Sequence, residues 1–208
     1  MKRLVIINLI LIIIIYLIPL KEKDVENIIK EEIEEPPPAV ALEVEVTSRH
    51  NTPRPEPIQK ITTLAVDSDL RQISNLTGDE FNKMLEGTAL YGIGNALAEA
   101  EIKHNINGLY LMGLACLESG YGTSKYAIER NNLVGWNAVD SNPNKATYFT
   151  SKSECISFVA SKLKVNYLSE DGRYFEGFTA RDIDKHYCSD KKHADKIIQI
   201  VNKLTKKL

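Results

Sequence analysis

Hydrophobic residues recur with helical spacing along most of the C-terminal two thirds of the chain. In the last such segment, five apolar side chains fall on one face of a helix predicted over about 191–204: Ala194, Ile197, Ile198, Val201 and Leu204. Similar patterns, with their start and stop signals, predict helices over about 77–86, 92–104, 109–118, 123–130 and 151–168, and a short helical piece that begins near Thr179. This part of the chain is therefore expected to be mainly helical.

Polar residues mark where several of these helices begin and end. A Ser or Thr three residues before a carboxylate, the spacing of a capping box, occurs at Thr77–Glu80, Ser151–Glu154 and Thr179–Asp182. Gly120 and Gly122 follow the 109–118 segment and predict the end of that helix.

Residues 135–150 have a different pattern, in which turn-forming residues replace the helical period. The turn-formers are Gly135, Asn137, Asp140, Ser141, Asn142 and Pro143. They lie between Trp136 and the β-prone run Thr147–Phe149, which predicts a small two-stranded hairpin or a structured loop. The expected fold is mainly α with one small β-hairpin lobe.

The N-terminal residues form a nearly continuous apolar run. Residues 4–20 are apolar apart from Asn8 and Tyr16, and as a helix these 17 residues would span roughly 25 Å, the short end of a transmembrane segment. The run lacks a small-x-small cleavage site, so an uncleaved single-pass anchor over residues 1–21 is favoured over a cleaved signal. Lys2 and Arg3 are expected to stay in the cytoplasm, with the rest of the chain outside the cell membrane.

Residues 22–70 are rich in charge and proline. Prolines 36–38, 53, 55 and 57 favour an extended, solvated spacer over a packed core. This segment is expected to act as a tether between the membrane and one domain over residues 71–208.

Composition narrows the classes of partner. The chain has 208 residues, of which 26% are charged, and a net charge of −2, so no basic surface indicates nucleic acid. The four histidines (50, 104, 186 and 193) and three cysteines (116, 155 and 188) form no cluster with metal-ligand spacing. We expect no metal or other cofactor, and the cysteines are expected to be buried free thiols, although a Cys155–Cys188 bridge is an alternative.

Glu118 stands out because it lies where an apolar helix ends. Burial disfavours the charged form of a carboxyl group, so Glu118 is expected to hold a proton near neutral pH. A positioned, protonated Glu is what cleavage of a glycosidic bond requires as its general acid. A surface Glu near a helix C-cap is the alternative.

Three motifs in order carry a family resemblance. They are Glu-Ser-Gly-Tyr-Gly-Thr-Ser at 118–124, Asn-Asn-Leu-Val-Gly-Trp at 131–136, and Tyr-x-Ser-Asp at 187–190. Together they resemble the family 73 glycoside hydrolases, the bacterial endo-β-N-acetylglucosaminidases of cell-wall autolysins, over about residues 75–208. The resemblance implies a lysozyme-like fold and hydrolysis of the β-1,4 bond after N-acetylglucosamine in peptidoglycan glycan strands. Val134 and Cys188 stand where the family often has Phe and Ala.

The resemblance also implies roles for individual residues. Glu118 would be the general acid, and Tyr187 would line the cleft and support catalysis, or else be a core tyrosine. The second carboxylate would be Asp140 or Glu154, unless the N-acetyl group of the substrate takes its place. Four further residues are candidates to bind sugars or to shape the cleft: Tyr121, Asn131, Asn132 and Trp136.

Two other readings remain open on the sequence alone. A muramidase or a lytic transglycosylase of lysozyme-like fold would also use an acid at this position. A catalytically inactive domain that binds glycan is the alternative of a different class. The oligomeric state is not indicated by the sequence.

Overall fold

The computed structural model describes residues 59–138 and 145–208, and this part of the chain is built from helices. They are α3 (Gly78–Leu85), α4 (Gly94–His104), α5 (Gly108–Ser119), α6 (Lys125–Arg130), α7 (Lys152–Tyr167), α8 (Ala180–Tyr187) and α9 (His193–Leu204), followed by the short 3-10 helix η2 (Thr205–Lys207). Every helix predicted in this region is present. The predicted anchor, most of the predicted tether and Asp140 lie outside the described residues.

The predicted caps form at two of the three helix starts. The Thr77 and Thr179 hydroxyls accept a backbone N–H three residues on, and Glu80 and Asp182 return the bond to the cap backbone. At α7 the Ser151 hydroxyl accepts the Glu154 N–H, but the Glu154 carboxylate bonds to Thr150, the residue before the cap, and not to the cap backbone. It accepts the Thr150 N–H at 2.6 Å and the Thr150 hydroxyl at 2.7 Å.

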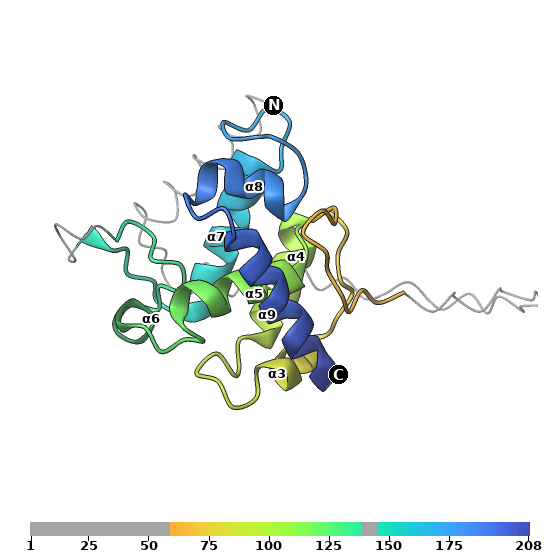
Figure 1. Cartoon of the computed structure of the whole chain (residues 1–208). Helices are drawn as coiled ribbons and strands as arrows, with labels where there is room; N and C mark the ends of the chain where they lie inside the picture. The colour runs from red at the N-terminus through yellow and green to blue at the C-terminus, as the bar shows by residue number, and fades with distance from the viewer. Residues whose placement is uncertain (1–58, 139–144) are drawn as a thin grey trace, which may run out of the picture. The chain divides into compact units, whose positions relative to one another are not determined.

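Helix α5 forms the centre of the core. Ten of its 12 residues are buried, and it packs against α4, α7 and α9 (Figure 1). Gly113 permits the close approach to α9, because a Cβ at this position would lie 2.7 Å from Val201 Cγ2 and 2.9 Å from Ile197 Cγ2. The packing of α5 on α9 brings the end of the first helix close to the start of the second.

The segment before α3 is packed on the helices. Leu64 and Leu70 are buried, and Leu64 exchanges two backbone hydrogen bonds with the Asn202 amide of α9. The packed domain therefore includes residues that the sequence assigned to the tether. The buried Glu101 carboxylate joins this segment to α5, because it accepts the backbone N–H groups of Ser74 and Gly108, both at 2.6 Å.

The predicted β-hairpin lobe is not found in the described residues, which contain no strand on either side of the 139–144 gap. The two arms are joined by one backbone hydrogen bond, from the Thr147 N–H to the Trp136 carbonyl at 3.0 Å, and by the buried amide of Asn132. Its Nδ2 donates to the carbonyls of Trp136 and Thr147, both at 3.0 Å, and its Oδ1 accepts the Trp136 N–H at 2.9 Å. The described residues on either side of the gap form a structured loop, the other alternative, and residues 139–144, where the turn was expected, lie outside the described part.

Among the helices in residues 59–138 and 145–208, none combines the length and apolar character needed to cross a bilayer.

Candidate active site

Glu118 lies in the last turn of α5, at the edge of a groove. The helix ends at Gly120, which adopts the left-handed conformation (φ +56°) that glycine accepts most readily. The groove has a volume of about 400 Å³ and is lined by Glu118, Val134, Gly135, Trp136, Asn137, Tyr167, Tyr187 and Cys188. The three motifs of the sequence therefore meet at one site, since each contributes a lining residue.

The Glu118 carboxylate is hydrogen-bonded to a histidine that the sequence analysis did not select. Glu118 Oε1 lies 2.7 Å from His193 Nε2, at the start of α9. The other ring nitrogen, His193 Nδ1, lies 2.8 Å from Asp184 Oδ1 on α8. The remaining oxygen of Asp184 accepts the Ala194 N–H. These contacts make a continuous chain from the groove through the buried His193 to α8: Glu118, His193, Asp184.

This arrangement favours a positively charged His193. Burial lowers the pKa of His193, but the hydrogen bonds to the Asp184 and Glu118 carboxylates outweigh it and raise that pKa to about 10. An imidazolium donates from both ring nitrogens, which matches a carboxylate oxygen on each side. The expectation that burial alone governs the charge of Glu118 therefore omitted its nearest partner.

Tyr187 lines the groove and also supports His193. Its ring stacks on the imidazole with centroids 5.5 Å apart and planes at 25°, and it touches Tyr167 at a centroid distance of 6.0 Å. Burial raises the pKa of Tyr187, so its hydroxyl keeps its proton and can donate at neutral pH.

Tyr110 is buried beneath this site. Its pKa is raised by burial and by the nearby Tyr187, Asp184 and Glu118. Within the described part of the chain, its hydroxyl is the one buried side-chain polar atom that lacks a hydrogen-bond partner. The site therefore keeps one further polar group close to the Glu118–His193–Asp184 chain.

The two asparagines of the second motif shape the loop beside the groove. Asn132 bonds to the loop backbone as described above, and the Asn131 amide donates to the Phe149 carbonyl at 3.0 Å. Asn131 also ends α6 in the left-handed conformation (φ +52°). Of the two roles predicted for these residues, fixing the loop is the one that their contacts match.

The remaining predicted site residues are divided between groove and scaffold. Trp136 lines the groove and packs edge-to-face on Phe158, with centroids 5.1 Å apart. Tyr121 is not among the described residues that line the groove; it packs against the core, and its backbone N–H caps α5 by donating to the Cys116 carbonyl at 2.8 Å. Its predicted place on the cleft floor therefore has no support in these contacts.

The second carboxylate is not found among the described groove residues. Glu154 does not line the groove, and its hydrogen bonds to Thr150 lower its pKa. Asp140 lies outside the described residues. Among those that the structure describes, Glu118 is the carboxylate of the groove, and no three His, Cys, Asp or Glu side chains are grouped to hold a metal ion.

One sequence signal could have pointed to His193. It lies four residues before Ile197 and eight before Val201, so it belongs to the buried face of α9. A histidine on an apolar helix face needs polar partners, and Asp184 supplies one from the preceding helix. The pairing with Glu118 gave no local signal, because 75 positions separate the two residues.

Solved structures with a similar fold include autolysin E of Staphylococcus aureus. This chain is 24% identical to it, with a TM-score of 0.55, and the match covers 66% of this chain and 69% of that chain. The same protein has been solved with the muropeptide NAM-L-Ala-D-iGlu (TM-score 0.55) and, as a catalytic mutant, with the disaccharide NAG-NAM (TM-score 0.54). Each of these matches has 24% identity and covers 66% of this chain and 70% of that chain.

Two curated relatives come from Streptococcus pneumoniae, strains TIGR4 and R6, and are provisionally named endo-beta-N-acetylglucosaminidases. Each is 32% identical over 146 residues, or 67% of this chain. The chain spans about a fifth of their length, 22% of one and 21% of the other. A family model, Glucosaminidase, matches residues 94–206, which confirms the family predicted from the motifs. Because that match covers more than half of the chain, the chain belongs to the glucosaminidase family, whose model is described as mannosyl-glycoprotein endo-beta-N-acetylglucosaminidase.

Proposed function

We propose that this chain is a peptidoglycan hydrolase that cleaves the β-1,4 bond after N-acetylglucosamine, with Glu118 as general acid. The observation that carries the proposal is the position of Glu118 at the edge of the groove, beside Trp136 and Tyr187. Family membership supports the reaction class. The two peptidoglycan fragments bound to the structurally similar autolysin E support the class of substrate.

The geometry suggests how Glu118 would act. Its Oε1 is bound by His193, whereas no hydrogen bond in the described part of the chain engages its Oε2. Oε2 would protonate the bridging oxygen as the bond to the anomeric carbon breaks and positive charge develops on the sugar ring. The Tyr187 hydroxyl would hold the N-acetyl group or a water beside the anomeric carbon, and Trp136 would pack on a sugar ring.

The second catalytic group is proposed to be either Asp140 or the N-acetyl group of the substrate, because Glu154 is held by Thr150. Replacing Asp140 with Asn separates the two routes. If Asp140 stabilises the cationic centre or activates water, kcat falls about a hundredfold. If the N-acetyl group attacks instead, the variant keeps the rate of the wild type, and a substrate without the N-acetyl group is not cleaved. Release of soluble muropeptides from purified peptidoglycan measures both.

Product analysis tests the proposed reaction. Digestion of purified peptidoglycan by the 208-residue chain should create reducing N-acetylglucosamine ends, detected by borohydride reduction and mass spectrometry. Reducing N-acetylmuramic acid ends would instead identify a muramidase, and anhydro ends a lytic transglycosylase. Binding of glycan without any new ends would identify a binding domain.

We also propose that residues 1–21 anchor the chain in the cell membrane and that the following proline-rich segment extends the domain toward the wall. The sequence pattern supports this location, since an apolar run follows two basic residues. Fractionation tests it: the chain should stay in the membrane pellet after a carbonate wash and be cut by protease added outside spheroplasts. Release by the wash would contradict anchoring.

A further inference from the structure

His193 is enclosed by two carboxylates from different helices, and one of them is the proposed acid. Nε2 lies 2.7 Å from Glu118 Oε1, and Nδ1 lies 2.8 Å from Asp184 Oδ1. We propose that His193, held by Asp184, is a positioning residue for Glu118 and stabilises the carboxylate that Glu118 becomes when it gives up its proton. This inference rests on the proposed function of the groove.

The imidazole ring is fixed on several sides. Asp184 bonds to His193 and, through its second oxygen, to the Ala194 N–H, which ties α8 to the first turn of α9. The Tyr187 ring stacks on one face of the imidazole. Because the ring cannot turn freely, it holds Glu118 Oε1 and leaves Oε2 as the oxygen available to substrate.

The elements packed around His193 place several polar groups near it. Among these groups, the two hydrogen-bonded carboxylates do most to raise its pKa. Helix α5 contributes Glu118 and Tyr110, α8 contributes Asp184 and Tyr187, the connection to α9 contributes Cys188 and Asp190, and α7 contributes Tyr167 through its contact with Tyr187. Lys196 on α9 is paired with Asp190 at 2.6 Å. The raised pKa of His193, about 10, keeps the ring positively charged through the neutral range.

A fixed positive charge assists the acid during proton transfer. It stabilises the carboxylate that remains after Glu118 has given its proton away, so proton transfer becomes easier. In the step itself, the Oε2–H bond breaks, the proton joins the bridging oxygen, and the electron pair of the broken C–O bond stays on that oxygen. His193 keeps both of its protons.

The variant His193→Gln tests this role, because Gln offers an uncharged N–H in place of Nε2. We expect kcat to fall at least about tenfold, because the charge that stabilises the Glu118 carboxylate is lost. KM for soluble glycan should change less than about twofold, since His193 is not among the groove-lining residues that the structure describes. Asp184→Asn should lower kcat by a smaller factor, also with little change in KM.

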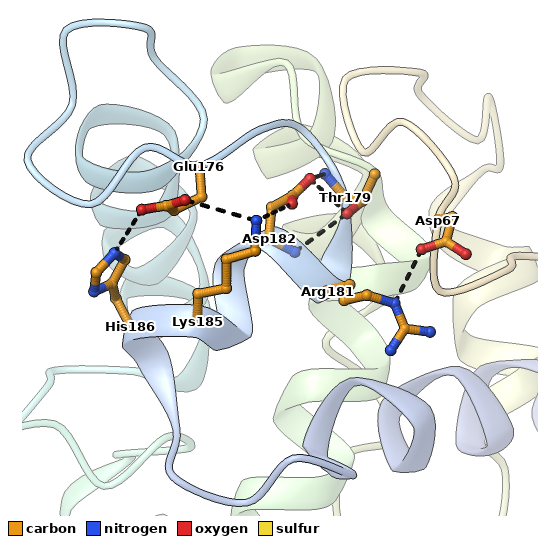
Figure 2. A network of polar contacts seen from close by, with 7 residues as sticks. All are labelled: Asp67, Glu176, Thr179, Arg181, Asp182, Lys185 and His186. Carbon is orange, nitrogen blue, oxygen red and sulfur yellow. Dashed lines mark hydrogen bonds and ion pairs between the residues drawn. The ribbon is translucent and has the colours of Figure 1, made fainter.

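A matched control uses another histidine–carboxylate pair. His186 Nε2 lies 3.1 Å from Glu176 Oε1, and both side chains are exposed (Figure 2). His186→Gln should leave kcat and KM unchanged. If His193→Gln keeps the kcat of the wild type, or if His186→Gln lowers kcat equally, the inference is wrong.

A spectroscopic measurement separates this inference from the proposed function and does not depend on the folding of a variant. In the wild-type chain with ¹⁵N-labelled histidine, both ring nitrogens of His193 should be protonated at pH 8. Comparison with the spectrum of Glu118→Gln identifies the His193 signals, because this substitution changes the group that contacts Nε2. A His193 that titrates near 6.5 would overturn the inference even if the chain cleaves glycan. A fully protonated His193 in a chain without glycan cleavage would instead refute the proposed function and leave the ion pair intact.

Discussion

Two histidine–carboxylate pairs in this domain have the same chemistry but different surroundings. His193 is 6% exposed and contacts Glu118 (28% exposed) and Asp184 (10%), whereas His186 and Glu176 are 42% and 41% exposed. Water screens the second pair more than the first. The comparison teaches that burial, more than pairing, decides how much such a contact contributes to the stability of the fold.

The exposed pair belongs to a surface network on the solvent side of α8. Glu176 lies between His186 and Lys185, and Lys185 also contacts Asp182, 3.0 Å away (Figure 2). The hydrogen bond from His186 is the main cause of the lowered pKa of Glu176. This network supports the start of α8, where Asp182 completes the capping box.

The largest expected effect is that of Glu118→Gln. Loss of the acid proton should lower kcat about a thousandfold, because general acid catalysis typically contributes factors of this size. Circular dichroism and glycan binding should stay close to those of the wild type, since the amide oxygen can still accept from His193. Glu176→Gln is the matched control and should retain full activity; a Glu118→Gln variant that retains it would remove Glu118 from the mechanism.

Asp184→Ala should cause the largest loss of stability in this comparison. It leaves a buried positive charge without its carboxylate, which should lower the free energy of unfolding by about 3 kcal/mol. Urea unfolding followed by circular dichroism measures this loss. Glu176→Ala, which opens a screened surface pair, should leave the unfolding midpoint unchanged; equal effects at the two sites would show that burial does not distinguish them.

The dependence of stability on pH should show a smaller difference. The pKa of His193 is raised in the folded state, to about 10, above its ordinary value of about 6.5 when unfolded. The stabilisation is therefore complete below about pH 6.5 and is lost as pH rises toward 10. Urea titrations at pH 6.5 and 10 should show this loss in the wild type and in His186→Gln. A similar loss in His193→Gln would assign it to other groups.

The helices were predictable from the sequence because their signals are local. The apolar spacing and the caps at Thr77 and Thr179 act within a few residues, and the helices of this region lie where they were predicted. The arrangement of the loop beside the groove was not predictable, since the buried Asn132 amide holds it through bonds that reach as far as Thr147. Turn-forming residues are compatible with a hairpin and with a loop.

The site was predictable only in part for a related reason. Glu118, Trp136 and Tyr187 belong to short motifs, and the structure brings all three to one groove. His193 and Asp184 join Glu118 only because α5 packs on α9 and α8 lies against α9, so their roles depend on contacts between distant segments. Patterns within single helices carry no information about such contacts.

A crystal structure of the Glu118→Gln variant with a bound chitooligosaccharide tests the central claim most directly. The account predicts a glycan in the groove beside Trp136 and Tyr187, with a bridging oxygen about 3 Å from the free side-chain atom of residue 118. A glycan bound elsewhere, or a residue 118 side chain turned away from every bridging oxygen, would contradict it.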